Sequence, residues 1–115
     1  MGSKLKELNI KSDMPAAKDA VARIASGIRS SKAAGASAVK IIHGYGSTGR
    51  GGKIRIEARR YFQEQKNKGL INDFIPGEEF SIFSGKTLKA FESCDELRKD
   101  SDLEGYNYGI TIVIL

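Results

Sequence analysis

The chain of 115 residues has little of several residue types, and each scarcity excludes a class of protein. Cys94 is its only cysteine, so an intrachain disulfide and a cysteine-based metal cluster are excluded. The only histidine, His43, lies far from Cys94 in the sequence with no motif joining them, so we interpret this cysteine as a small buried hydrophobe rather than a nucleophile. No apolar run approaches the roughly 20 residues of a membrane helix, and the first residues lack the apolar segment of a secretory signal. We therefore predict a cytoplasmic protein with no membrane partner.

Length and composition predict one globular domain, residues 1–115, because 40% of the residues are hydrophobic and 29% are charged. The charge is unevenly spread. Residues 1–76 carry 15 Lys and Arg against 6 Asp and Glu, for +9, whereas residues 77–115 carry 4 against 8, for −4. A basic body fits the binding of a phosphate backbone, and a solvated lysine-rich surface is the open alternative.

The hydrophobic pattern predicts an α/β sandwich in which four strands alternate with two crossover helices and right-handed connections. Between the third and fourth strands the pattern is ambiguous: residues 78–83 fit an extended hairpin and residues 86–99 fit a helix. The predicted strands are residues 5–10, 38–42, 70–75 and 110–115, and the predicted main helices are residues 15–32 and 53–68.

The segment from His43 to Gly52 reads His-Gly-Tyr-Gly-Ser-Thr-Gly-Arg-Gly-Gly and lies between a predicted strand and a predicted helix. Five glycines in ten residues lose much entropy on folding, which weakens a fold unless the backbone must adopt special conformations or approach a ligand closely. Backbone N–H groups at glycines and at a helix N-terminus attract anions. The segment therefore predicts a site for a phosphate or a nucleic-acid backbone.

Two better-known phosphate-binding patterns fit this segment poorly. A Walker A loop is excluded because Ser47 stands where its first glycine belongs and Ile54 replaces the metal-binding hydroxyl. Residues 44–49 match the dinucleotide pattern G-x-G-x-x-G, but residues 50–52 intervene before the predicted helix. The acidic partner for a ribose would have to be Asp73, near the middle of its predicted strand, so we interpret this match as weak.

Two side chains of the segment have both a functional and a structural interpretation. His43 lies at the carboxyl end of a strand, where ligands gather in α/β sheets, and it fits a general acid or base or a charged donor to a phosphate. The structural alternative is a group hydrogen-bonded to nearby backbone. Tyr45, between two glycines, fits either stacking on a base or covering the apolar side of the helix.

Basic residues follow at the start of the predicted helix, where the helix dipole already favours anions. Beside the glycines, we predict that Arg50 and Lys53 contact phosphates. The role of Arg59 and Arg60 is open, with a solvated helix face as the alternative.

Residues 39–46, Val-Lys-Ile-Ile-His-Gly-Tyr-Gly, resemble the hydrophobic strand and His-Gly-x-Gly of the Smr family, a small domain related to the C-terminal part of MutS2-type proteins. Residues 8–11 and 109–115 resemble the family's first and last strands. The resemblance covers residues 8–76 and 109–115, with 77–108 as an insertion. It implies a mixed sheet of about four strands with two main helices, similar to the C-terminal domain of translation initiation factor three. It also implies nucleic-acid binding, with nicking or endonucleolytic activity in some members.

This chain departs from the family in its first strand. The family carries Leu-Asp-Leu-His there, with an Asp and a His implicated in cleavage, and this chain has Asn9 and Lys11 instead. Asn is a poor base and a weak metal ligand, whereas Lys11 can still bind a phosphate as a point charge. Asp13 is expected to cap the first helix rather than replace the missing carboxylate. The expected enzyme is thus a phosphodiesterase with impaired or altered catalysis, with His43 as its tentative acid or base.

The resemblance predicts a domain that binds DNA or RNA, with no cofactor and with a divalent metal ion as the open alternative. The rival hypothesis is a protein-interaction module without nuclease activity, in which the acidic insertion presents Phe80, Phe83, Phe91 and Leu97. The predicted nucleic-acid-binding residues are Lys11, Gly44, Tyr45, Gly46, Ser47, Thr48, Gly49, Arg50 and Lys53.

Overall fold

A computed structural model describes residues 4–10, 16–44 and 50–115, without the side chain of Arg50. Strands and helices alternate in its first half, and a third helix precedes the last strand. The elements are β1 (Leu5–Asn9), α1 (Ala17–Ala33), β2 (Ala38–Ile42), α2 (Arg50–Asn67), β3 (Asp73–Pro76), a 3-10 turn (Gly77–Glu79), α3 (Gly85–Ser93), a second 3-10 segment (Asp95–Lys99) and β4 (Ile110–Ile114).

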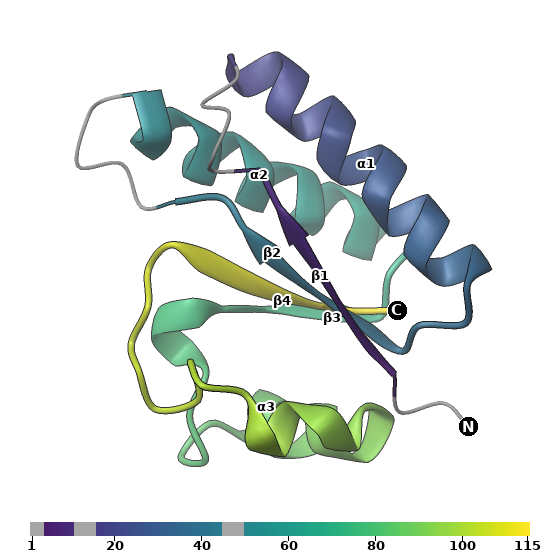
Figure 1. The fold of residues 1–115 in the computed structure, drawn as a ribbon, viewed down its shortest axis with the longest axis vertical. Coiled ribbons are helices and arrows are strands. Elements are labelled where there is room, and N and C mark those ends of the chain that lie inside the picture. The colour runs from purple at the N-terminus through teal and green to yellow at the C-terminus, as the bar shows by residue number, and fades with distance from the viewer. Residues whose placement is uncertain (1–3, 11–15, 45–49) are drawn as a thin grey trace.

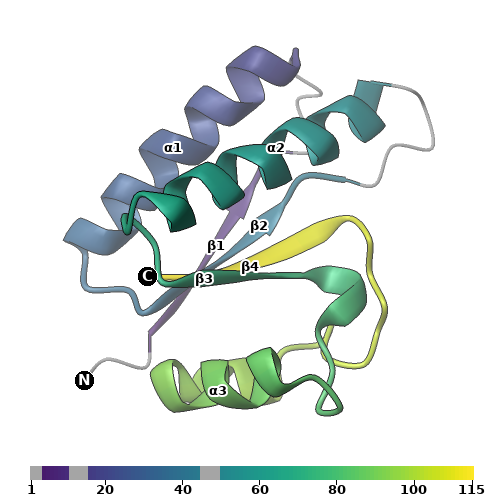
Figure 2. The same cartoon turned by 180° about the vertical axis from the view of Figure 1, so that it is seen from behind.

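The four strands form one mixed sheet in the order β1-β2-β4-β3. β1 and β2 are parallel, and β4 runs antiparallel to both of its neighbours, β2 and β3. Helices α1 and α2 make the two crossovers between parallel strands and lie side by side on one face of the sheet, while α3 covers the other face (Figures 1 and 2). The four-stranded α/β sandwich predicted from the sequence is confirmed, and the described residues form three α-helices instead of the two main ones predicted.

Each face of the sheet has its own apolar core, and β4 contributes to both. Because successive side chains of a strand point to opposite faces, Ile110, Ile112 and Ile114 pack with the α3 layer and Val113 packs with α1 and α2. Thr111 lies on the same face as Val113. It therefore places a hydroxyl at the buried boundary between β4 and α2.

Helix α2 begins at Arg50, three residues earlier than predicted. The predicted helix began only after Gly51 and Gly52, because glycine is a poor helix former. In the structure the helix is anchored by its apolar side, where Ile54 and Ala58 are fully buried against the sheet. Tertiary packing of this side outweighs the low propensity of two glycines in the first turn.

The segment before β4 also differs from the prediction. Residues 78–83 form no hairpin, because the 3-10 turn Gly77–Glu79 brings Phe80 into the core below the sheet. The predicted helix over residues 86–99 exists as two pieces, α3 and the second 3-10 segment, separated at the extended residue Cys94. This segment is the third layer of the fold.

Candidate functional site

The predicted site lies at the edge of the sheet where β2 ends and β4 begins, since Ile42 pairs with Ile110. The carbonyl oxygen of Gly109 accepts the N–H groups of both His43 and Gly44, at 3.0 Å each. Gly44 has a φ of 81°, a left-handed conformation that favours glycine, and there the chain leaves the sheet. Five predicted binding residues, Tyr45, Gly46, Ser47, Thr48 and Gly49, lie outside the described residues, as do Lys11 and Asp13.

The His43 ring is buried at this edge, with 1% of the residue exposed, and both of its nitrogens are engaged. Nδ1 lies 2.8 Å from the carbonyl oxygen of Gly44, which can only accept, so Nδ1 carries the proton. Nε2 lies 2.9 Å from the hydroxyl of Thr111 and accepts its hydrogen. The ring therefore fixes the backbone at the first glycine of the predicted loop.

Burial lowers the pKa of His43 from 6.5 to about 4. The hydrogen bond to the Gly44 carbonyl opposes this shift, and the nearby positive charges of Arg59 and Arg55 add to it. The ring is thus neutral at pH 7. Of the two functional interpretations, the charged donor to a phosphate does not fit this geometry.

A polar network continues from His43 to the surface through Thr111 and Arg59. The Nε of Arg59 donates to the Thr111 hydroxyl at 3.3 Å, and its two terminal nitrogens bind the two carboxylate oxygens of Glu78 at 2.7 Å each. Arg59 also donates to the carbonyl oxygen of Ile110 at 3.2 Å. Such a bidentate ion pair fixes the guanidinium in one orientation. Arg59 is therefore a partly buried cation with fixed partners and does not belong to a solvated helix face.

Thr111 and Glu78 belong to this network although the sequence pattern did not indicate them. The available signal for Thr111 was a lone hydroxyl within the apolar run of residues 110–115, because a buried polar side chain requires a partner. Nothing in the sequence paired Glu78 with Arg59, since the contact depends on how β3 brings the following 3-10 turn beside α2.

The first turn of α2 carries the basic residues Arg50 and Lys53. No acidic residue lies in its first turn, although acidic residues stabilise a helix N-terminus. Lys53 is exposed on the rim of a groove of about 550 Å³ between α1 and α2. Two further cations, Lys18 and Arg60, and two acidic residues, Glu57 and Glu64, also line this groove. Within the described part of the chain, Lys53 and Lys18 have no acidic partner, whereas Arg60 pairs with Glu57 at 3.1 Å.

Another cationic side chain, Lys40, is buried in β2. Two carboxylates from the segment 77–108 neutralise its charge. Its ammonium lies 3.0 Å from a carboxylate oxygen of Asp100 and 2.6 Å from one of Asp102. Burial alone would lower the pKa of Lys40, but the two carboxylates raise it overall. This segment is therefore tied to the sheet by buried charge as well as by apolar packing.

The apolar surface predicted for the rival hypothesis does not exist as proposed. Phe80, Phe91 and Leu97 are buried in the core beneath the sheet. Of the four residues named for that surface, Phe83 alone is exposed, at 87%. The three others are part of the third layer, because a sheet with an apolar second face needs such a cover.

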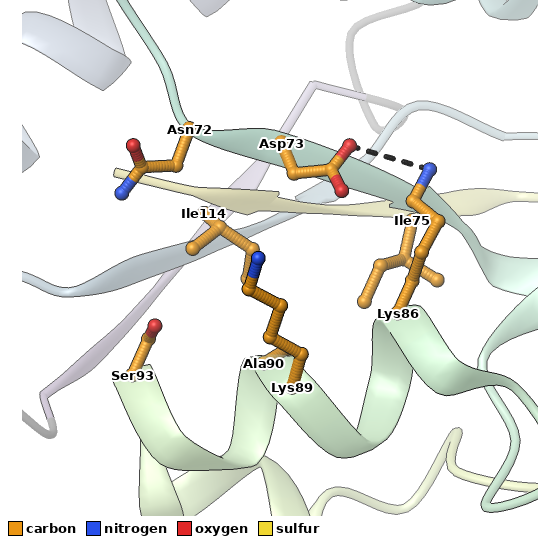
Figure 3. A pocket seen from close by; sticks show the side chains of 8 residues that line it. All are labelled: Asn72, Asp73, Ile75, Lys86, Lys89, Ala90, Ser93 and Ile114. Carbon is orange, nitrogen blue, oxygen red and sulfur yellow. Dashed lines mark ion pairs between the residues drawn. The ribbon is translucent and has the colours of Figure 1, made fainter.

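A separate cavity of about 260 Å³ lies between β3 and α3 and contains none of the predicted nucleic-acid-binding residues (Figure 3). Asp73 lines it and forms an ion pair with Lys86 at 3.3 Å. Because Asp73 pairs with Ile114, this cavity lies at the opposite end of β4 from Gly109. Asp73 is thus far from Gly44, and the dinucleotide interpretation loses its acidic partner for a ribose.

Two further properties concern only the described ranges, 4–10, 16–44 and 50–115. No group of three or more His, Cys, Asp or Glu side chains is placed there to hold a metal ion. None of the helices in these ranges combines the length and the apolar character that crossing a bilayer requires.

With the sheet order β1-β2-β4-β3 and two helices on one face, the chain has an Smr-like fold. The chain is similar to the crystal structure of the Smr domain of Thermus thermophilus MutS2, with a TM-score of 0.54, 18% sequence identity, and coverage of 97% of this chain and 96% of that chain. The sequence matches no model of a known protein family and no curated protein. The resemblance predicted from residues 39–46 is confirmed at the level of the fold, and the assignment of residues 77–108 as an insertion stays a prediction.

Proposed function

We propose that the domain binds the phosphate backbone of DNA or RNA through residues 43–52 and the first turns of α2. One observation carries the proposal: α2 starts within the glycine segment, at Arg50, and has basic residues, with no acidic ones, in its first turn. Such a sequence weakens the isolated helix, because like charges meet at the positive end of its dipole. A bound phosphate reverses this repulsion, and local rules are most often broken at functional sites.

The buried network supports the proposal by fixing where the loop begins. The His43 ring is hydrogen-bonded to the Gly44 carbonyl and to the Thr111 hydroxyl, and Arg59 donates a hydrogen bond to that hydroxyl. The backbone at Gly44, where the chain leaves the sheet, is therefore fixed by hydrogen bonds. A loop whose first residue is fixed in this way loses less entropy when it binds a ligand. In this proposal the predicted binding residues Gly44, Arg50 and Lys53, together with Lys11 and residues 45–49, contact phosphate, and Lys18 extends the contact along the groove between α1 and α2.

The salt dependence of binding tests the proposal. Affinity for a nucleic acid should fall linearly with salt on a log-log plot, and Arg50→Ala and Lys53→Ala should each reduce the slope by about 1. Lys68→Ala, an exposed cation beyond the opposite end of α2, is the matched control and should leave the slope unchanged. Undetectable binding at low salt, or equal slopes in all variants, would contradict the proposal.

Cleavage is a second candidate, favoured by the network that orients the imidazole of His43 beside the proposed binding loop. In this candidate His43 is the acid or base of a phosphodiesterase. Its Nε2 must first release the Thr111 hydroxyl, because both ring nitrogens are hydrogen-bonded. The carboxylate of the family's first strand is replaced by Asn9, so we expect slow cleavage.

Supercoiled plasmid and structured RNA, incubated with the wild type and with a His43→Gln variant, test for cleavage. Loss of nicking in the variant is the expected result, since glutamine cannot exchange a proton as imidazole does. Equal nicking by both proteins would exclude His43 as the group responsible.

A further inference from the structure

Two exposed tyrosines lie in the segment that enters β4, next to the proposed binding loop. Tyr106 is 60% exposed and Tyr108 is 51% exposed. The carbonyl of Tyr108 accepts a hydrogen bond from Arg59 at 3.3 Å, and the next residue, Gly109, accepts the N–H groups of His43 and Gly44. The two tyrosines therefore belong to the same edge of the sheet as the start of the glycine segment.

The backbone that carries these rings is held in one conformation. Glu104 and Tyr106 have φ values of 65° and 50°, a left-handed conformation that is unfavourable for residues with a side chain. The Glu104 carboxylate accepts the Ser81 hydroxyl at 2.8 Å and the backbone N–H of Ile82 at 2.6 Å. These contacts offset the strain on one side of Tyr106. Strained residues that the surroundings hold in place cluster at binding sites.

Asn107, between the two tyrosines, anchors the segment from the other side. Its side chain donates to Asp102 at 3.0 Å and accepts the N–H of Gly109 at 2.8 Å. Its backbone carbonyl packs so closely on Gly77 that any side chain there would overlap it. With Asn107 held in this way, Tyr106 and Tyr108 flank an open groove of about 400 Å³.

We propose that Tyr106 and Tyr108 stack on unpaired bases, so that the ligand of this domain is a single-stranded stretch of nucleic acid whose phosphates lie on the start of α2. The inference rests on the proposed function. Bases in a duplex are stacked on each other and cannot cover an exposed ring, whereas splayed bases of a single strand can. Exposed phenol rings whose backbone contacts a cationic side chain of α2, Arg59, supply the combination of stacking surface and positive charge that binds single strands.

Fluorescence anisotropy with a labelled oligothymidylate of about 12 nucleotides, as a single strand and in a duplex, tests the inference. Replacing Tyr106 or Tyr108 by alanine should weaken single-strand binding about 10-fold each and leave duplex binding unchanged. The corresponding phenylalanine variants should keep the wild-type affinity, because they keep the stacking face. Phe83→Ala, which removes an exposed ring outside this segment, is the matched control and should change neither affinity.

The outcomes separate this inference from the proposed function. Wild-type protein that binds neither probe at low salt overturns both. Wild-type binding that is unchanged in the alanine variants overturns stacking on these rings and leaves phosphate binding intact. An equal loss of single-strand and duplex affinity also overturns stacking, because the rings would then contact the backbone. The protein has no tryptophan, so quenching of tyrosine fluorescence by the single strand, reduced in the phenylalanine variants, is a second expected result.

Discussion

Acidification to about pH 5 should destabilise this protein through one residue, His43. The ring is buried and neutral in the folded state, where its pKa is about 4, and its ordinary pKa is 6.5. Because the folded pKa is lowered, the unfolded chain takes up the proton first as the pH falls. The stabilisation is complete above pH 6.5 and is lost progressively toward pH 4. From these two pKa values, the free energy of unfolding should fall by about 2 kcal/mol between about pH 7.5 and about pH 5.

Urea unfolding followed by circular dichroism at a series of pH values measures this effect. The assignment to one residue is clean because His43 is the only histidine. The lowered pKa values of Asp73 and Asp102 act below their ordinary value of 3.8, outside this range. A His43→Gln variant should lose the dependence between about pH 5 and about pH 7.5. A wild-type stability that is flat over this range, or a fall that persists in the variant, would refute the buried and neutral state of His43.

Two substitutions test the other buried polar contacts. Thr111→Val removes the hydroxyl that donates to His43 and should lower the free energy of unfolding by about 2 kcal/mol, because a buried acceptor loses its partner. Thr87→Val, equally buried but with hydrogen bonds of 3.3 and 3.4 Å, should lower it less; an equal loss would contradict the role assigned to the Thr111 hydroxyl. Lys40→Met leaves two partly buried carboxylates without their buried cation and should lower it by about 3 kcal/mol in urea unfolding. Arg60→Ala, at an exposed ion pair, should change it by less than about 1 kcal/mol, and similar losses in both variants would contradict the burial argument.

Elements with a regular apolar period could be predicted from the sequence. The stripe of α1, with Ala20, Ile24 and Ile28 buried, and the β-branched run of β4 both determine their own structure locally. The start of α2 could not be predicted in the same way, because Gly51 and Gly52 have low helix propensity and the packing of Ile54 outweighs it.

Contacts between distant parts of the chain were beyond sequence reasoning. Phe80, Phe91 and Leu97 were assigned to a surface because nothing local shows that the sheet has a second apolar face to cover. For the site, the sequence indicated His43 and Gly44 from the end of a strand. It did not indicate Thr111 or Glu78, which reach the site through the pairing order of the strands.

That pairing order also determines when the domain can fold. β4 is the last strand in sequence, yet it lies in the interior of the sheet, between β2 and β3. Before β4 arrives, β1 and β2 can pair with each other, but β3 has no neighbour. During synthesis on the ribosome the sheet therefore cannot be completed, and both of its apolar faces stay incomplete, until residues 110–114 emerge. Long-range pairing of this kind slows folding, and the unpaired edges of β2 and β3 are exposed to aggregation meanwhile.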